Sequence, residues 1–173
     1  TAPEDYGLIL NDNSARDDDN TAFNDTAPTS VNMCLGSSST TNDGSTMIAY
    51  FFAGKSGYSK FGSYKGNGNA DGMFVYTGFR PRFVLFKIVS TTGDWILSST
   101  IVETYNGINA QYCIPNDAAA EADSSSTNLL DVYANGFKAR SSANQNSSGA
   151  DYVYAAFSEF PIVSSSDIPG LAR

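Results

Sequence analysis

The sequence contains no histidine and only two cysteines among its 173 residues. Without histidine the chain cannot form a Ser-His-Asp or Cys-His relay, a His-Glu-x-x-His zinc site or a two-histidine iron site. Cys34 and Cys113 are far apart in the chain, and each lies in a short apolar stretch. We expect them to be two buried small hydrophobic side chains, with a disulfide left open as the alternative.

Basic residues are also scarce. Ten lysines and arginines stand against 18 acidic residues, which gives a formal net charge of −8. No basic excess is available to neutralise phosphates, so we expect no nucleic-acid partner. No run of 18 apolar residues occurs, so we expect no membrane insertion. The N-terminus lacks the features of a signal peptide, and we expect Thr1 to result from a cleavage or from a cut in a longer chain.

The residues that are abundant indicate a β protein. Serine, threonine, asparagine and glycine make up more than a third of the chain, whereas 16% of the residues are charged. Hydrophobic residues reach 41% and aromatic residues 13%, which is enough to build a core. This composition is typical of turn-rich β proteins found outside cells or on particle surfaces.

Two blocks of sequence recur at one offset. Gly44–Ala53 matches Gly149–Ser158 in pattern, and Asn11–Ala15 matches Asn116–Ala120, both at an offset of 105 residues. This self-similarity predicts a repeat of about 105 residues, which is the size of a domain. Its second copy is complete at residues 55–161. Residues 1–54 hold the C-terminal part of a first copy, and residues 162–173 form a tail.

Strand signals follow one another closely. We expect strands at residues 73–76, 82–89, 95–98 and 137–140, with a hairpin turn at residues 91–94. Residues 48–52 and 152–157 are apolar on both faces, which favours central strands. Residues 117–123 could form a turn or two of helix. The pattern predicts an all-β fold, an antiparallel β-sandwich.

The aromatic strand expected at residues 47–53 needs a partner. A strand with two apolar faces and no neighbour would be prone to aggregate. We therefore expect it to be covered by another subunit, by an upstream segment or by the edge of the second copy.

Two clusters are candidate binding sites. An aromatic face and a carboxylate could hold a sugar, and the residues of this kind are Asp94, Trp95, Tyr105 and Tyr112. The alternative is that the single tryptophan belongs to the core. A cation cluster could bind an anion or a neighbouring subunit, and it consists of Lys55, Lys60, Lys65, Arg80 and Arg82. The alternative is that these cations join complementary faces of packed strands.

Metal and catalytic sites are not expected. The loop at residues 66–72 places oxygen-bearing side chains at alternate positions, but glycine stands where a calcium loop needs its twelfth-position acid. Positive backbone angles in a hairpin loop explain its glycines better. The acidic run at residues 17–20 could also hold Ca²⁺, but we expect its charged side chains to be solvated. No spacing pairs two carboxylates for glycoside hydrolysis, so we expect no cofactor, no metal and no enzyme activity.

Several segments resemble a repeat found in large virion proteins of tailed bacteriophages, commonly labelled tail fibre or structural proteins. These segments are residues 58–68, 75–87, 92–95, 135–138 and 152–159. The resemblance covers about residues 8–161, and the chain's ending at residues 168–173 is also similar to those proteins' C-termini. It implies a virion location and supplies no catalytic residues.

These observations together predict a structural, non-catalytic protein of a bacteriophage virion, such as a tail fibre, head fibre or decoration protein. It would sit on the virion surface and act in particle assembly or host attachment. Its partners would be other copies of itself, as a trimer by analogy with similar fibres, other virion proteins and a host surface glycan. The alternative is a secreted carbohydrate-binding module or adhesin. A depolymerase would need a carboxylate pair, which the spacing does not provide.

Overall fold

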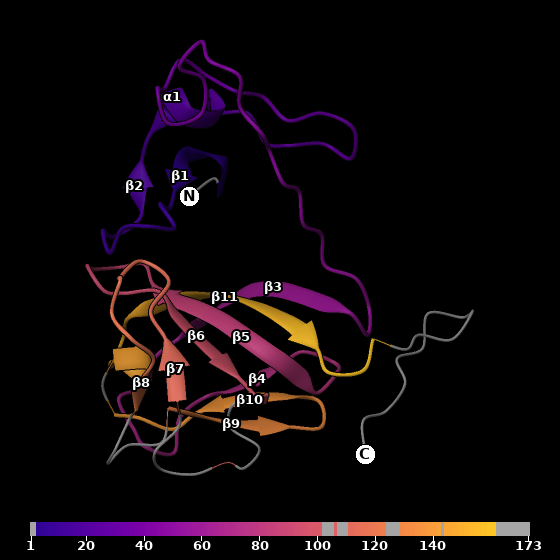
Figure 1. The fold of residues 1–173 in the computed structure, drawn as a ribbon, viewed down its shortest axis with the longest axis vertical. Coiled ribbons are helices and arrows are strands. Elements are labelled where there is room, and N and C mark those ends of the chain that lie inside the picture. The colour runs from indigo at the N-terminus through magenta and orange to yellow at the C-terminus, as the bar shows by residue number, and fades with distance from the viewer. Residues whose placement is uncertain (1–2, 102–105, 107–110, 124–128, 143, 162–173) are drawn as a thin grey trace.

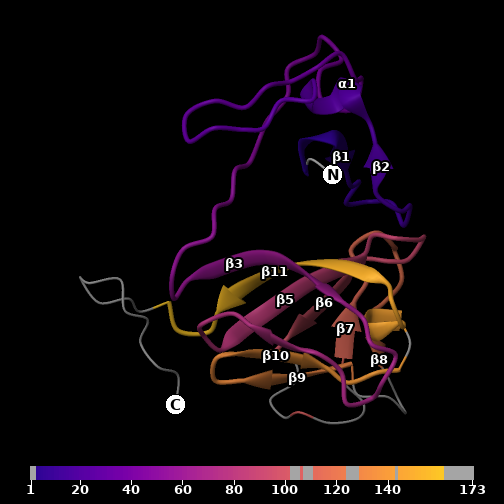
Figure 2. The ribbon, with the colours of Figure 1, turned by 180° about the vertical axis from the view of Figure 1, so that it is seen from behind.

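The computed structural model describes residues 3–101, 106, 111–123, 129–142 and 144–161, and it contains two packed antiparallel sheets (Figures 1 and 2). The larger sheet has six strands in the order β3 (Ser59–Lys65), β11 (Asp151–Ser158), β5 (Pro81–Ile88), β6 (Ile96–Ser99), β7 (Gln111–Cys113) and β8 (Ala122–Asp123). The smaller sheet has three strands in the order β4 (Phe74–Tyr76), β10 (Gly136–Ala139) and β9 (Leu130–Tyr133). The predicted all-β antiparallel sandwich is confirmed.

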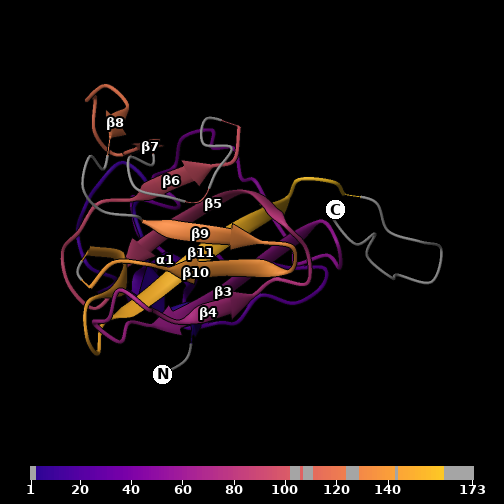
Figure 3. The same ribbon diagram turned by 90° about the horizontal axis from the view of Figure 1, so that it is seen from below.

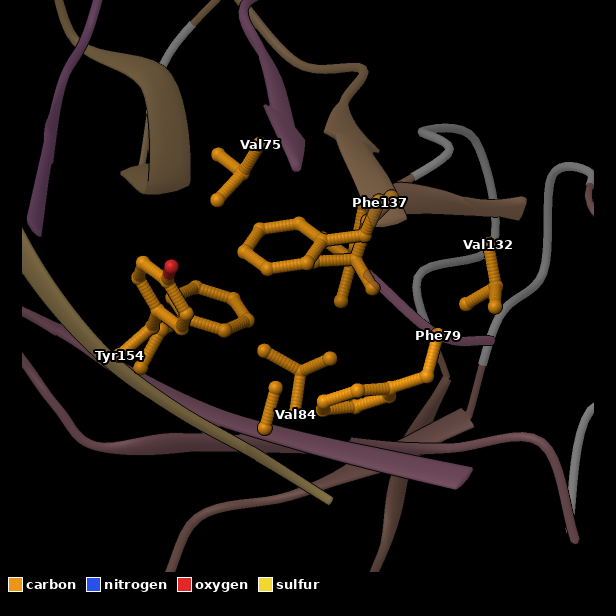
Figure 4. Packing of buried hydrophobic residues seen from close by; sticks show 10 residues of the cluster. Val75, Phe79, Val84, Val132, Phe137 and Tyr154 are labelled. Carbon is orange, nitrogen blue, oxygen red and sulfur yellow. The ribbon is translucent and has the colours of Figure 1, made fainter. Parts of the chain in front are cut away.

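Seen from below, the strands of the smaller sheet lie across those of the larger sheet (Figure 3). The core lies between these two sheets. Val75 and Phe137 of the smaller sheet face Val84 and Tyr154 of the larger one, and all four are at most 8% exposed (Figure 4). The rings of Phe137 and Tyr154 meet edge to face, with centroids 5.3 Å apart. Burying a side chain such as Phe137 stabilises the fold by about 1.5–3 kcal/mol, so these contacts hold the layers together.

Strand β11 is an interior strand of the larger sheet, with a neighbour on each side. Its residue Tyr154 is paired with Gly62 of β3 on one side and with Phe86 of β5 on the other. Its alternate residues Tyr152, Tyr154 and Ala156 are buried at 6% exposure or less. The prediction of a central strand at residues 152–157 is therefore confirmed. So are the predicted strands at 73–76, 82–89, 95–98 and 137–140, which correspond to β4, β5, β6 and β10.

The chain before β3 forms a separate layer over the outer face of the larger sheet (Figure 1). Its elements are short: η1 (Pro3–Asp5), β1 (Tyr6–Gly7), β2 (Asp17–Asp18) and α1 (Asn20–Phe23). Asp19 caps α1 by accepting a hydrogen bond from the backbone N–H of Thr21. Among the described residues no helix is both long and apolar enough to cross a membrane.

Backbone contacts fix this layer to the turn that joins β5 to β6. Gly93 N–H donates to the carbonyl of Asn13 at 2.8 Å, and Arg16 N–H donates to the carbonyl of Val89 at 3.1 Å. The indole Nε1–H of Trp95 donates to the carbonyl of Ile9 at 2.9 Å. The first residues of the chain are thus held against the sandwich near one end of β5.

The expected strand at residues 48–52 is wrong for this chain. These residues have no strand structure, and Tyr50 and Phe52 are 79% and 69% exposed. The place between β3 and β5, which an apolar strand of this kind would fill, is already taken by β11. The ring of Phe52 contacts Phe61 of β3 and Phe157 of β11, with centroids 6.3 and 6.2 Å apart. This contact leaves the segment largely exposed, so the edge of the sandwich covers it only at Phe52.

Two smaller expectations also need correction. Residues 117–123 form no helix: they follow a turn, continue without regular structure and then enter β8. Cys34 is half-buried and Cys113 is exposed, and both are free thiols. Cys113 is not buried because the alternation of β7 turns Tyr112 toward the core and Cys113 away from it.

Candidate ligand-binding pocket

A pocket of about 370 Å³ lies at the end of the sandwich where β5 turns into β6. Its rim is the turn Thr91–Asp94, and its walls include Tyr112 of β7 and Tyr152 of β11. Gln145, from the short helix η2 (Asn144–Asn146), and Ser147, which follows that helix, line the remaining side. The pocket therefore combines aromatic walls with hydroxyl, amide and carboxylate groups.

Gln145 is the most unusual group in this pocket. Its side chain is 2% exposed, and its Nε2 has no hydrogen-bond partner among the described residues. Its backbone carbonyl accepts a hydrogen bond from the hydroxyl of Tyr64 at 2.9 Å, which holds η2 against the sandwich. A buried amide left without a partner costs about 1–3 kcal/mol, so Nε2 of Gln145 is a strained feature beside the pocket.

Asp94 is held in place at the rim. Its Oδ1 accepts a hydrogen bond from Nδ2 of Asn116 at 2.8 Å, and Oδ1 of Asn116 accepts one from the backbone N–H of Trp95 at 2.8 Å. These contacts tie the β5–β6 turn to the turn that follows β7. Asp94 is exposed, so its second oxygen can accept hydrogen bonds from hydroxyl groups.

The structure brings together only part of the predicted sugar site. Asp94 and Tyr112 both line the pocket, whereas Trp95 does not line it. The ring of Trp95 lies 5.9 Å from Nζ of Lys87, and its Nε1–H binds Ile9. Tyr105 lies outside the described residues. Trp95 is therefore a contact for the N-terminal layer, and Tyr112 is the aromatic residue available to a ligand.

Lys87 lies behind the pocket, on the outer face of β5. Its side chain is fully buried, and its Nζ donates to the carbonyl of Gly93. Burial lowers the pKa of Lys87, while the charges of Asp94 and Asp12 act in the opposite direction. Phe86 and Ile88, on the other face of the strand, line the pocket. Lys87 thus lies close enough to the N-terminal layer to feel the charge of Asp12, and it does not line the pocket.

The predicted cation cluster is distributed over separate local contacts. Arg80 Nε and Arg82 Nη1 both bind the carboxylate of Glu159, at 2.6 and 3.1 Å. Lys65 binds Asp151 at 3.0 Å. Lys60 donates to the carbonyl of Tyr76 at 2.9 Å and lies over its ring, and Lys55 is exposed. Three of the five cations therefore pair with carboxylates in or just after β11.

The glycine-rich loop at residues 66–72 closes on a buried asparagine. Asn146 is fully buried, and its Nδ2 donates to Oδ1 of Asn67, to the carbonyl of Asn69 and to the carbonyl of Ser141. Gly68 has a φ of 67°, which glycine adopts without strain. The predicted hairpin is wrong, because the loop joins β3 of the larger sheet to β4 of the smaller one. No group of three or more metal-ligating side chains occurs among the described residues.

Sequence reasoning missed Gln145 and Asn146. They stand in a run of serine, alanine and asparagine that reads as an ordinary loop. Only the folded chain shows that Asn146 supports the glycine-rich loop and that Gln145 lines the pocket. No sequence signal distinguishes these two amides from their exposed neighbours.

The fold and the pocket define a two-layer all-β domain that presents a small polar cavity at one end. Residues 1–161 match the model of a domain of unknown function (DUF7483), and the chain belongs to this family. No curated protein matches the chain. No solved structure matches it either.

Proposed function

We propose that the chain is a non-catalytic structural component of a bacteriophage virion surface that acts in particle assembly or host attachment. The observation that carries this proposal is the large exposed apolar surface of the N-terminal layer. Ile48, Tyr50, Phe51 and Phe52 are each 69–79% exposed within one segment that has no regular secondary structure. Continuous apolar exposure of this kind marks an interaction surface, because a soluble monomer would aggregate through it.

The chemistry of the pocket supports a non-catalytic role. Of the described residues that line it, Asp94 is the only one with a carboxylate. Glycoside hydrolysis requires two carboxyl groups about 5–10 Å apart. A single acid beside an amide, a tyrosine and threonine hydroxyls is suited to holding a ligand by hydrogen bonds.

The resemblance to repeats of phage virion proteins supplies the location in this proposal, and the composition agrees with it. The test is electron microscopy of purified phage particles that encode this chain, labelled with an antibody against it. Labelling at a defined part of the particle is the expected result. Recovery of the protein only in the fraction without particles would contradict the proposal.

The oligomeric part of the proposal is tested separately. We expect the purified chain to sediment as a symmetric oligomer, with a trimer as the favoured state by analogy with similar fibres. Analytical ultracentrifugation over a range of concentrations measures this directly. A chain that stays monomeric at all concentrations would contradict self-assembly.

A second candidate function is glycan binding, and the observation that favours it is that the exposed carboxylate of Asp94 and the ring of Tyr112 line the same pocket. A sugar in the pocket would donate a hydrogen bond from a hydroxyl group to Asp94 and pack its C–H groups against Tyr112, beside Gln145. The test is a glycan array with the parent chain and with Asp94→Asn and Gln145→Ala. Asp43→Asn serves as the control, because Asp43 is an exposed acid that only caps its own turn.

Loss of a specific glycan signal in both pocket variants, with the control unchanged, would support this second function. No glycan signal from the parent chain, or equal signals from all four proteins, would exclude it.

A further inference from the structure

The short hairpin of the N-terminal layer has the same register as the hairpin that ends the larger sheet. In β1 and β2, Tyr6 is paired with Asp18 and Gly7 with Asp17. In β7 and β8, Gln111 is paired with Asp123 and Tyr112 with Ala122. Each residue of the first hairpin is 105 positions before its counterpart in the second. This is the offset at which the two blocks of sequence recur.

The turns inside the two hairpins are also built alike. Asp12 N–H donates to the carbonyl of Ile9, and Asp117 N–H donates to the carbonyl of Ile114. Oδ1 of Asp12 accepts from the N–H of Ser14, and Oδ1 of Asp117 accepts from the N–H of Ala119. Both hydrogen bonds of the turn recur at the offset of 105 residues.

The same offset relates the exposed apolar segment to β11. Gly44 and Gly149 both have a positive φ, 84° and 76°, just before the segment in question. Residues 46–53 correspond to Asp151–Ser158, which is the whole of β11. Strand β11 is paired on both sides and buries its alternate residues. Its counterpart is unpaired, and none of its backbone N–H groups donates to another described residue.

We propose that residues 6–53 are the second half of a sandwich unit, and that residues 46–53 form its central strand when the first half of another unit supplies the neighbours. The partner is a segment equivalent to residues 55–105 in another copy of this unit. Strands equivalent to β3 and β5 would pair with the two edges of residues 46–53, as β3 and β5 do with β11. A strand equivalent to β6 would pair with β1, as β6 does with β7.

The strands of this chain cannot supply that partner. Both β3 and β5 are paired along their lengths with β11, so no gap between them remains. The outer edge of β3 is free beyond the single bridge between Lys55 and Ser59, but it offers one neighbour and not two. A strand that is apolar on both faces needs a sheet on both edges and a layer on each face.

The test is a chain with an additional copy of residues 55–105 fused before Thr1, which restores the spacing of 105 residues. Hydrogen–deuterium exchange is measured for peptides covering residues 46–53. In the parent chain we expect these amides to exchange rapidly, and in the fusion we expect exchange to slow at least 100-fold, because both edges of the strand become paired. The amides of β11 serve as the internal reference, since they are paired in both proteins.

Two further variants control the experiment. A fusion of the same length, made from residues 111–161, contains no equivalents of β3 and β5 and should leave residues 46–53 unprotected. In the active fusion, Ala49→Tyr with Phe51→Ala gives the segment the same side chains as Tyr154 and Ala156 of β11. This variant allows the unit to form even where Phe51 is too large for the added copy.

Three outcomes would overturn the proposal. The first is rapid exchange of residues 46–53 in both versions of the active fusion. The second is equal protection in the active and the control fusions, which would show that the partner is not specific. The third is slow exchange in the parent chain as a monomer, which would show that the segment pairs within its own chain.

Discussion

The N-terminal layer, residues 3–54, and the sandwich, residues 59–161, differ in where their hydrophobic side chains lie. Among the described residues, Ala22 is the only buried hydrophobic residue of the N-terminal layer, whereas the other buried hydrophobic residues all belong to the sandwich. Yet residues 47–52 have the apolar character of β11. The difference teaches that an apolar strand sequence becomes a strand only where neighbouring strands offer free backbone groups and a second layer covers its face.

The largest expected change in the free energy of unfolding comes from a substitution in the core of the sandwich, and a matching substitution in the N-terminal layer should have almost no effect. Phe137→Ala removes a fully buried ring from between the sheets and should lower the free energy of unfolding by about 3–5 kcal/mol. Phe51→Ala removes a ring that is 71% exposed and should change it by less than about 0.5 kcal/mol. Urea denaturation measures both variants. A large loss for Phe51→Ala would mean that the N-terminal layer is packed in solution.

Asn146→Ala should have the next largest effect. It removes a buried amide that holds the loop between β3 and β4, leaves several acceptors unsatisfied and should cost about 2–3 kcal/mol. The matched control is Asn42→Ala in the N-terminal layer, where an exposed amide makes a single bond to the carbonyl of Gly36. Equal losses for the two variants, measured by thermal denaturation, would contradict the contrast between the regions.

The pH dependence of stability, followed at Lys87, tests whether the N-terminal layer covers the sandwich. Burial lowers the pKa of Lys87 in the folded chain below its ordinary value of 10.5. As pH rises toward that value, the folded state loses its proton before the unfolded state does, so stability should rise. Lys87→Met should abolish this rise, measured by urea midpoints between about pH 7.5 and 9.5, below the range in which tyrosines titrate.

The half-buried Tyr64 sets the upper limit of that pH range. Burial raises the pKa of Tyr64 well above its ordinary value, so its ionisation would destabilise the fold at higher pH. An unchanged pH slope in Lys87→Met would show that the lysine is accessible to solvent and that the N-terminal layer does not cover it.

The smallest expected effect comes from Asp71, an exposed carboxylate at the end of the glycine-rich loop. Hydrogen bonds and charge from Lys138, and then from Arg140, lower the pKa of Asp71 below 3.8. Its stabilising contribution is therefore present above about pH 4 and is lost as pH falls through the lowered value. Asp71→Asn should be slightly less stable than the parent at pH 7 and indistinguishable from it at strongly acidic pH. A difference that persists in acid would contradict this assignment.

Much of the sandwich could be predicted because its strands carry their signals locally. The alternation of Phe137, Lys138 and Ala139 and the hairpin turn at Thr91–Asp94 are short-range patterns. The pocket could be predicted only in part. Asp94 and Tyr112 come from different strands, and they meet because β6 pairs with β7. Gln145 lines the same pocket because it lies in η2, and no periodic pattern in the sequence predicts this short helix.

The sequence by itself determined the class of the fold, because alternating apolar residues and glycine- or asparagine-rich turns permit short strands and little helix. It also determined that the chain lacks histidine chemistry. Only the tertiary structure decided which of two similar apolar segments became a central strand. Residues 151–158 pair with β3 on one edge and with β5 on the other, whereas residues 46–53 pair with no strand. The physical reason is that strand pairing satisfies backbone groups from two different segments, so a single segment does not contain the information that decides it.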